Sequence, residues 1–283
     1  MLPFWISIAL LSIAQGAVVA LPRAVTAPAL GGLRGRRWAV IPPLSVISFV
    51  LIARAAEHAS AQGLTYLALC SVPPLAAVAL GRLSRGARPR LALLVVALFA
   101  LAWADQGGLA GDAAALELSA LSCVTLGVLL AAVTPPRWLA AGIVAMAIAD
   151  TVLVVSDLLR RPSNTLNAAH PAAGLPRLQS VELGSAVMGY GDLFVAALLG
   201  ALLAAAAGPA MQLRGAALTT ALALCFDLLF FFVNELPATV PVALALVLLI
   251  LRRPRQFSWR QESPVAARAG PLAARPAHTP VAR

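Results

Sequence analysis

The chain of 283 residues is 61% hydrophobic and only 11% charged, and its mean hydropathy is +0.90. A water-soluble domain of this length has no use for so much apolar surface, so the composition excludes a soluble enzyme and indicates an integral membrane protein. The formal charge of +10 comes from arginine alone, because the chain contains no lysine. These arginines lie in loops and in the tail, where membrane topology and anionic headgroups explain them. We therefore expect the lipid bilayer as a partner, and no nucleic acid.

Nine segments are apolar enough to be spanning helices, which predicts an all-α, polytopic membrane fold with about nine transmembrane helices. The first begins without positive charge and is therefore interpreted as a helix rather than as a secretory signal. The segments are approximately 2–21, 38–52, 63–81, 91–104, 113–133, 138–159, 181–207, 214–233 and 236–251. We divide the chain into a scaffold (1–133), catalytic helices (134–251) and a basic, disordered tail (252–283).

The distribution of arginine predicts the orientation in the membrane. The loops after segments one, three, five and seven carry 4, 4, 1 and 1 arginines, with Arg214 at the start of segment eight counted in the last, and the tail carries 7. The opposite loops carry 1, 0, 3 and 0. The positive-inside rule then places the amino terminus outside and the tail in the cytoplasm. The lysine-free composition, rich in Ala, Arg, Gly and Pro, favours a GC-rich genome and hence a prokaryotic plasma membrane.

Two acids lie deep in consecutive segments, Asp150 in the sixth and Asp192 in the seventh. An ionisable residue within a spanning segment is costly and marks a functional site by default. At 1.5 Å per residue, Asp150 lies roughly 14 Å and Asp192 roughly 16 Å from the same membrane face, if the segments end at 159 and begin at 181. Two facing carboxyl groups would share one proton, so that one acts as a base on water while the other polarises a carbonyl group.

The run Gly189-Tyr190-Gly191-Asp192 resembles the GxGD motif of presenilin and signal peptide peptidase, the intramembrane aspartyl proteases. That family has an acid in its sixth helix, GxGD in its seventh and a Pro-Ala-Leu element opening its ninth. This chain has Asp150, the GxGD run and Pro237-Ala238-Thr239 in the same order. The resemblance implies that Asp150 and Asp192 are the catalytic pair and that Pro237 and Ala238 pack against the active site. It also implies that the substrates are transmembrane segments or leftover signal peptides.

The chain departs from the family in two places. Ala149 precedes the first acid where the family usually has Tyr, and Thr239 replaces the Leu of Pro-Ala-Leu. Other functions stay open: a proton-coupled transporter or ion-leak protein could use the same buried acids, and a prepilin-type GxGD peptidase ranks lower because no basic residue follows the motif closely.

The individual acids also have plainer interpretations. Asp192 could be a packing acid bonded to Tyr190 or to a neighbouring Ser or Thr. Asp157 is expected to reach the membrane interface, and Asp227 to have a structural role or to line a water-filled cavity. An intramembrane zinc protease is not expected, because the chain has no HExxH motif and its histidines fall outside the apolar segments. No feature of the sequence suggests a metal, nucleotide or redox cofactor, and we expect none.

Overall fold

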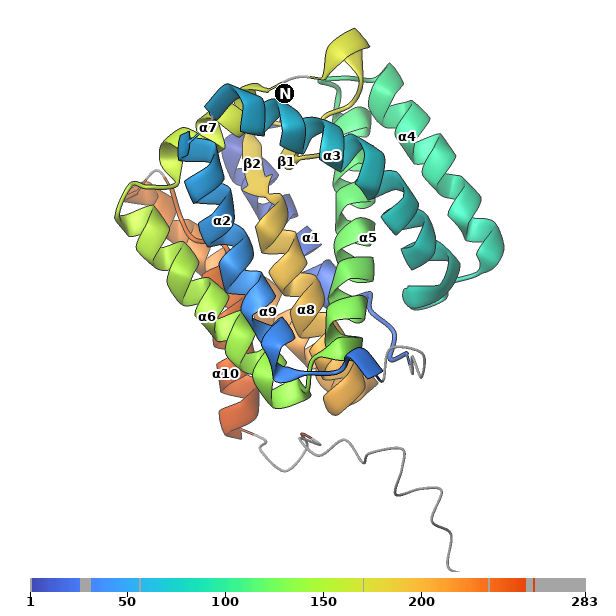
Figure 1. Cartoon of the computed structure of the whole chain (residues 1–283), viewed down its shortest axis with the longest axis vertical. Coiled ribbons are helices and arrows are strands. Elements are labelled where there is room, and N and C mark those ends of the chain that lie inside the picture. Colours follow the sequence, from blue (N-terminus) through green and yellow to red (C-terminus); the bar gives the residue numbers. More distant parts are fainter. Residues whose placement is uncertain are drawn as a thin grey trace, which may run out of the picture.

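The structure is a computed structural model that describes residues 2–25, 32–55, 57–169, 171–233 and 235–252, together with residue 257. Helices form most of this described part (Figure 1). The predicted tail lies outside the described residues, apart from Arg252 and Phe257. The helices of the described residues are α1 (Phe4–Ala20), α2 (Ile41–Ala55), α3 (Glu57–Val78), α4 (Leu94–Ala104), α5 (Leu109–Val133), α6 (Pro136–Val155), α7 (Arg160–Ala168), α8 (Tyr190–Ala206), α9 (Pro209–Asp227) and α10 (Thr239–Arg252).

Five helical stretches of the described chain are long and apolar enough to cross a membrane: Arg36–Ala55, Ala59–Leu83, Leu109–Val133, Pro136–Val155 and Pro209–Phe231. These stretches include short 3-10 or π turns that extend α2, α3 and α9. Four shorter apolar helices accompany them: Phe4–Ala20, Pro89–Ala104, Tyr190–Ala206 and Thr239–Arg252. Each of the nine predicted segments thus contains an apolar helix, although length and composition alone qualify five of them.

Helix α8 occupies the centre of the molecule, packed against α1, α5, α6, α9 and α10 (Figure 1). Every residue from Leu193 to Leu203 is buried except Phe194. The helix is apolar on all sides, as a fully enclosed helix must be. Small residues let the neighbours approach closely: a Cβ atom on Gly127 of α5 would lie only 2.8 Å from the carbonyl carbon of Ala197.

The connections gather at two ends of the helical body. At one end, Pro22 forms a bridge with Ser84, and the Arg85 side chain reaches Gln212 at the start of α9. At the other end, the Ser185 backbone N–H donates to Ser7 of α1. The chain therefore passes back and forth through the body, with α1 starting at one end and α10 finishing at the opposite end (Figure 1).

The first third of the predicted seventh helix is wrong, because residues 180–189 form a β-hairpin. Strand β1 (Ser180–Leu183) pairs antiparallel with β2 (Ala186–Gly189), and α8 begins only at Tyr190. Gly184, the first of two turn residues, has a φ of +64°, which a two-residue hairpin turn requires and glycine adopts without strain. Alternate residues of the hairpin face the core, a period of two that average hydropathy does not distinguish from a helix. These core-facing residues are Val181, Leu183, Ala186 and Met188.

Two predicted loops contain helices. The polar stretch 53–62 is largely helical, since α3 begins at Glu57. The predicted loop 160–180 contains α7. This helix is rich in Arg, Asn, Ser and Thr, a polar composition that favoured the prediction of a loop. In addition, α6 ends at Val155 rather than at 159, and Asp157 lies just beyond that end with a φ of +53°.

Candidate active site

Asp150 lies on α6, five residues before the helix ends at Val155. Its side chain is buried, with 6% of the residue exposed. One carboxyl oxygen, Oδ2, accepts a hydrogen bond of 2.6 Å from the Thr239 hydroxyl. Thr239 is fully buried and is the first residue of α10. The Pro-Ala-Thr run is therefore in direct contact with the first acid.

Asp192 lies in the first turn of α8 and is partly exposed. Its Oδ2 accepts a hydrogen bond of 3.1 Å from the backbone N–H of Gly189, the residue that precedes the helix. This is the carboxylate half of a capping box, in which an acid satisfies an N–H at the start of its own helix. The helix dipole also favours negative charge at this position. The last residue of the GxGD motif thus caps the helix that begins within the motif.

The two acids lie on α6 and α8, helices that pack against each other. Met146, one turn before Asp150, has its terminal carbon 3.6 Å from the position that a Cβ atom on Gly191 would occupy. The structure therefore places the two predicted catalytic residues on adjoining helices. The prediction that Asp150 and Asp192 lie at equal depth assumed a helix that starts at residue 181. In the structure a β-hairpin occupies residues 180–189, so that count of helical residues does not apply to Asp192.

Tyr190, the variable residue of the motif, is held by α5. Its hydroxyl group is hydrogen-bonded to the Ser122 hydroxyl at 2.7 Å, and its carbonyl oxygen accepts from the Cys123 thiol at 3.7 Å. The Tyr190 hydroxyl therefore has another partner than Asp192, contrary to the packing interpretation of that acid. Ser122 and Cys123 fix the start of α8, and no motif in the sequence marks them.

Pro237 is buried, and the carbonyl oxygen of Ala238 accepts a hydrogen bond of 2.8 Å from the Gln15 side chain of α1. Sequence reasoning missed Gln15, which is 1% exposed. A signal for it exists, because an amide side chain in the middle of an apolar segment needs a partner. The identity of that partner cannot be read from the sequence.

The two rival acids lie elsewhere. Asp157 is exposed in the turn after α6. Asp227, the last residue of α9, accepts a hydrogen bond of 2.7 Å from the Ser12 hydroxyl of α1. Both are therefore outside the hydrogen bonds that surround Asp150 and Asp192.

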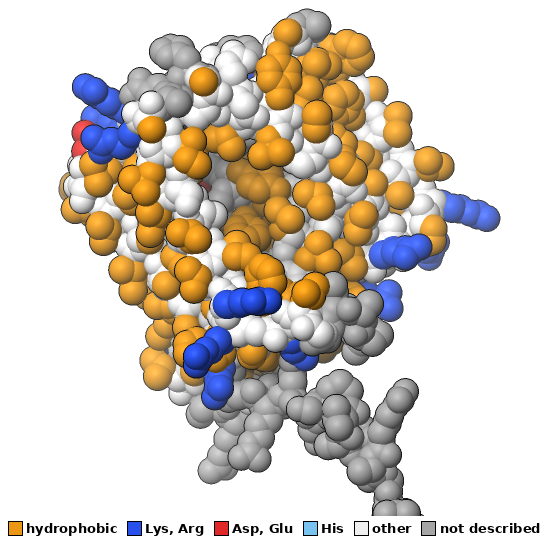
Figure 2. All heavy atoms as spheres, in the orientation of Figure 1, with side chains coloured by type: hydrophobic (Ala, Val, Ile, Leu, Met, Phe, Trp, Pro, Cys, Tyr) orange, Lys and Arg blue, Asp and Glu red, His pale blue; other side chains and the backbone are white. Residues whose placement is uncertain are grey.

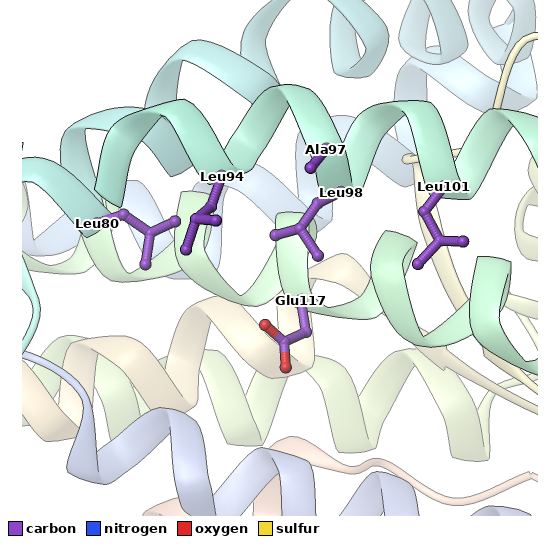
Figure 3. A pocket seen from close by; sticks show the side chains of 6 residues that line it. All are labelled: Leu80, Leu94, Ala97, Leu98, Leu101 and Glu117. Carbon is purple, nitrogen blue, oxygen red and sulfur yellow. The ribbon is translucent and has the colours of Figure 1, made fainter. Parts of the chain in front are cut away.

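A separate apolar cavity of about 230 Å³ lies between α4, α5 and the end of α3. Figure 3 shows Glu117 of α5 beside the leucines of α4 that line this cavity. Neither aspartate lines this cavity. The described residues contain no group of three or more His, Cys, Asp or Glu side chains that could hold a metal ion.

The face shown in Figure 2 is largely hydrophobic, as a lipid-facing surface is. It is hollowed between α2 and α5, in the region where α8 runs behind them (Figures 1 and 2). Comparison of the chain with protein-family models, curated proteins and solved structures finds no match in any of the three.

Proposed function

We propose that the chain is an intramembrane aspartyl protease that uses Asp150 and Asp192 to hydrolyse peptide bonds within transmembrane segments or signal peptides. One observation carries this proposal. Asp150 and Asp192 lie on two apolar helices that pack against each other, and the residue after Pro237-Ala238 donates a hydrogen bond to Asp150. A structural ion pair would need a basic partner, and the two ion pairs of the described residues lie elsewhere, at Arg160–Glu235 and Arg177–Glu182.

The chemistry needs one ionised and one protonated carboxyl group. The ionised group takes a proton from water, whose oxygen attacks the peptide carbonyl carbon, while the protonated group donates its proton to the carbonyl oxygen. The resulting tetrahedral intermediate loses its C–N bond as the leaving nitrogen takes a proton from the first carboxyl group. One hydroxyl group of the intermediate returns its proton to the second carboxylate as the carbonyl group re-forms. The pair ends with one proton, as it began.

The hairpin offers a way to present an extended peptide to this pair. In the described chain β2 pairs only with β1, and it runs directly into Gly189 and Asp192. A sheet edge can bind an added strand through its free backbone groups. Gly189 must stay small, since a Cβ atom there would lie 3.0 Å from Oδ2 of Asp192. We infer that a substrate helix unwinds beside β2 before it is cut.

The proposal includes nine membrane crossings in a presenilin-like arrangement, with the amino terminus outside. Signal peptide peptidase has this orientation, which by analogy favours substrates whose own amino terminus is cytoplasmic. Three helices of 14–17 residues (α1, α8 and α10) and the Pro89–Ala104 stretch would cross with the help of the residues that flank them.

The test is cleavage of a single-span signal peptide by the purified full-length chain in liposomes, followed by mass spectrometry. We expect Asp150→Asn and Asp192→Asn each to reduce the rate by about 10³-fold or more, because each removes one half of the pair. Asp157→Asn and Asp227→Asn serve as matched controls and should retain activity.

Three results would overturn the proposal. The pair is wrong if Asp150→Asn still cleaves, or if Asp227→Asn abolishes cleavage while the protein stays folded. Proton leakage through the wild-type liposomes, lost in Asp192→Asn and accompanied by no peptide cleavage, would instead establish the transporter or ion-leak function.

A further inference from the structure

Two polar side chains of α1 reach into the protein from one face of that helix. Ser12 and Gln15 are three residues apart, a spacing that places both on the same side. Both are buried, with 2% and 1% of the residue exposed. A hydroxyl or amide group in an apolar interior is costly without a partner, and here each has one: Ser12 donates to Asp227 and Gln15 donates to Ala238.

These two partners lie at opposite ends of the α9–α10 connection, residues 228–238. Asp227 is the last residue of α9, and Ala238 comes directly before α10. Aromatic contacts strengthen the first attachment, since Phe4 and Trp5 of α1 pack against Phe230 and Phe231 at ring-centroid distances of 5.5 and 4.5 Å. Helix α1 therefore holds the connection at both ends.

The second attachment leads to the candidate active site through one peptide unit. Gln15 holds the carbonyl oxygen of Ala238, and the next residue, Thr239, donates to Asp150. Since α10 begins at Thr239, fixing Ala238 fixes the direction in which that hydroxyl group points. A displacement of about 1 Å at a catalytic group can reduce the rate about a hundredfold.

We propose that Gln15 is a positioning residue for Asp150, which acts by holding Ala238 so that Thr239 is aimed at the acid. This inference rests on the proposed protease function and extends it to α1, a helix assigned only to the scaffold. It also gives Asp227 a structural task, as the anchor of the other end of the same connection.

A second buried glutamine provides the matched control. Gln212 of α9 is fully buried and donates to the carbonyl oxygens of Val19 and Pro22. It has the same chemistry as Gln15 but lies at the opposite end of the body from Thr239. Gln212 also accepts from Arg85, so Gln212→Leu removes more hydrogen bonds than Gln15→Leu does and is the more severe change. Even so, only Gln15→Leu should disturb the acid.

The experiment measures kcat and thermal stability of Gln15→Leu, Gln212→Leu, Thr239→Val and the Gln15→Leu/Thr239→Val double variant. We expect Gln15→Leu to lower kcat about tenfold and Gln212→Leu to leave it within about twofold. The double variant should be no slower than Thr239→Val alone, because Gln15 acts through the hydroxyl group that is already gone. Independent, multiplicative losses would overturn the inference, as would equal losses in both glutamine variants.

An infrared measurement decides the inference without any cleavage. The carboxyl band of Asp150, identified by its disappearance in Asp150→Asn, should shift in Gln15→Leu in the same direction as in Thr239→Val and stay in place in Gln212→Leu. An unchanged band in Gln15→Leu would refute the positioning role. If wild-type protein cleaves no peptide but the band shifts as expected, the protease proposal fails while the positioning contact stands.

Discussion

At the scale of single residues, the candidate site is held by hydrogen bonds from helices outside the motif. Thr239 donates to Asp150, and Ser122 of α5 is bonded to Tyr190 of the GxGD run. Asp192 takes its own position by accepting from Gly189. Each acid thus has an oxygen fixed by a donor, which is the preorganisation that positions a catalytic group.

Thr239 provides the sharpest test at this scale, because it is also where the chain departs from Pro-Ala-Leu. Thr239→Val keeps the shape of the side chain and removes the donor to Asp150. A hydrogen bond to a charged group contributes about 1.5–3 kcal/mol, so we expect kcat to fall about ten- to a hundredfold. Thr239→Ser keeps the hydroxyl group and should stay within about threefold of wild type. Equal rates for the Ser and Val variants in the liposome cleavage assay would show that the hydrogen bond has no role in catalysis.

At the scale of elements, α8 decides how the site is built. Its Leu and Ala side chains are buried against the surrounding helices. The hairpin before it ends at Gly189, so the GxGD residues lie at the start of the helix. The close contact between α5 and α8 then keeps Ser122 within reach of Tyr190. Close packing of small residues between α5 and α8 therefore helps to hold Tyr190 of the candidate site.

Average hydropathy located the apolar segments because their composition alone carries that signal. It missed the hairpin, since the stretch from Val181 to Met188 is apolar enough to be averaged into the helix that follows. Asp150, Asp192 and the Pro-Ala-Thr run could be identified as candidates from the sequence, because their order along the chain is visible there. The partners Gln15 and Ser122 could not be predicted, since they depend on which helices become neighbours.

Gly127 tests the packing of α5 against α8. A Cβ atom there would lie 2.8 Å from the backbone of Ala197, so Gly127→Val must push the helices apart. We expect a loss of about 1–3 kcal/mol in stability together with a loss of cleavage, since the start of α8 moves. Gly63→Ala is the control: the site is open, with nothing within 4 Å, and alanine should stabilise α3 by up to about 1 kcal/mol. Thermal unfolding in detergent compares the two, and a stable Gly127→Val would contradict the close contact.

At the scale of the whole molecule, the connections alternate between two ends of the helical body, as expected of a chain that passes back and forth through it. The loops after α1, α3 and α8 meet at one end, where Arg85 reaches Gln212 and the Pro209 carbonyl oxygen. Most of the described arginines gather at this end. Arg160, Arg161 and Arg177 lie at the other, and two of them are paired with acids: Arg160 with Glu235 and Arg177 with Glu182. The charges of Arg160 and Arg177 are therefore partly neutralised by nearby acids at that end.

The topology can be mapped with reporters fused after successive connections, using alkaline phosphatase for the outside and a fluorescent protein for the cytoplasm. We expect phosphatase activity for fusions after Gln106 and Gly174, and fluorescence for fusions after Arg88, Pro135 and Gly208. The decisive pair brackets the hairpin and α8. Seventeen residues of helix span only about 25 Å, less than the apolar thickness of about 30 Å, so the hairpin must supply the remaining depth. The same reporter active after both Gly174 and Gly208 would show that this unit does not cross, and the proposed placement of Asp192 within the membrane would fail with it.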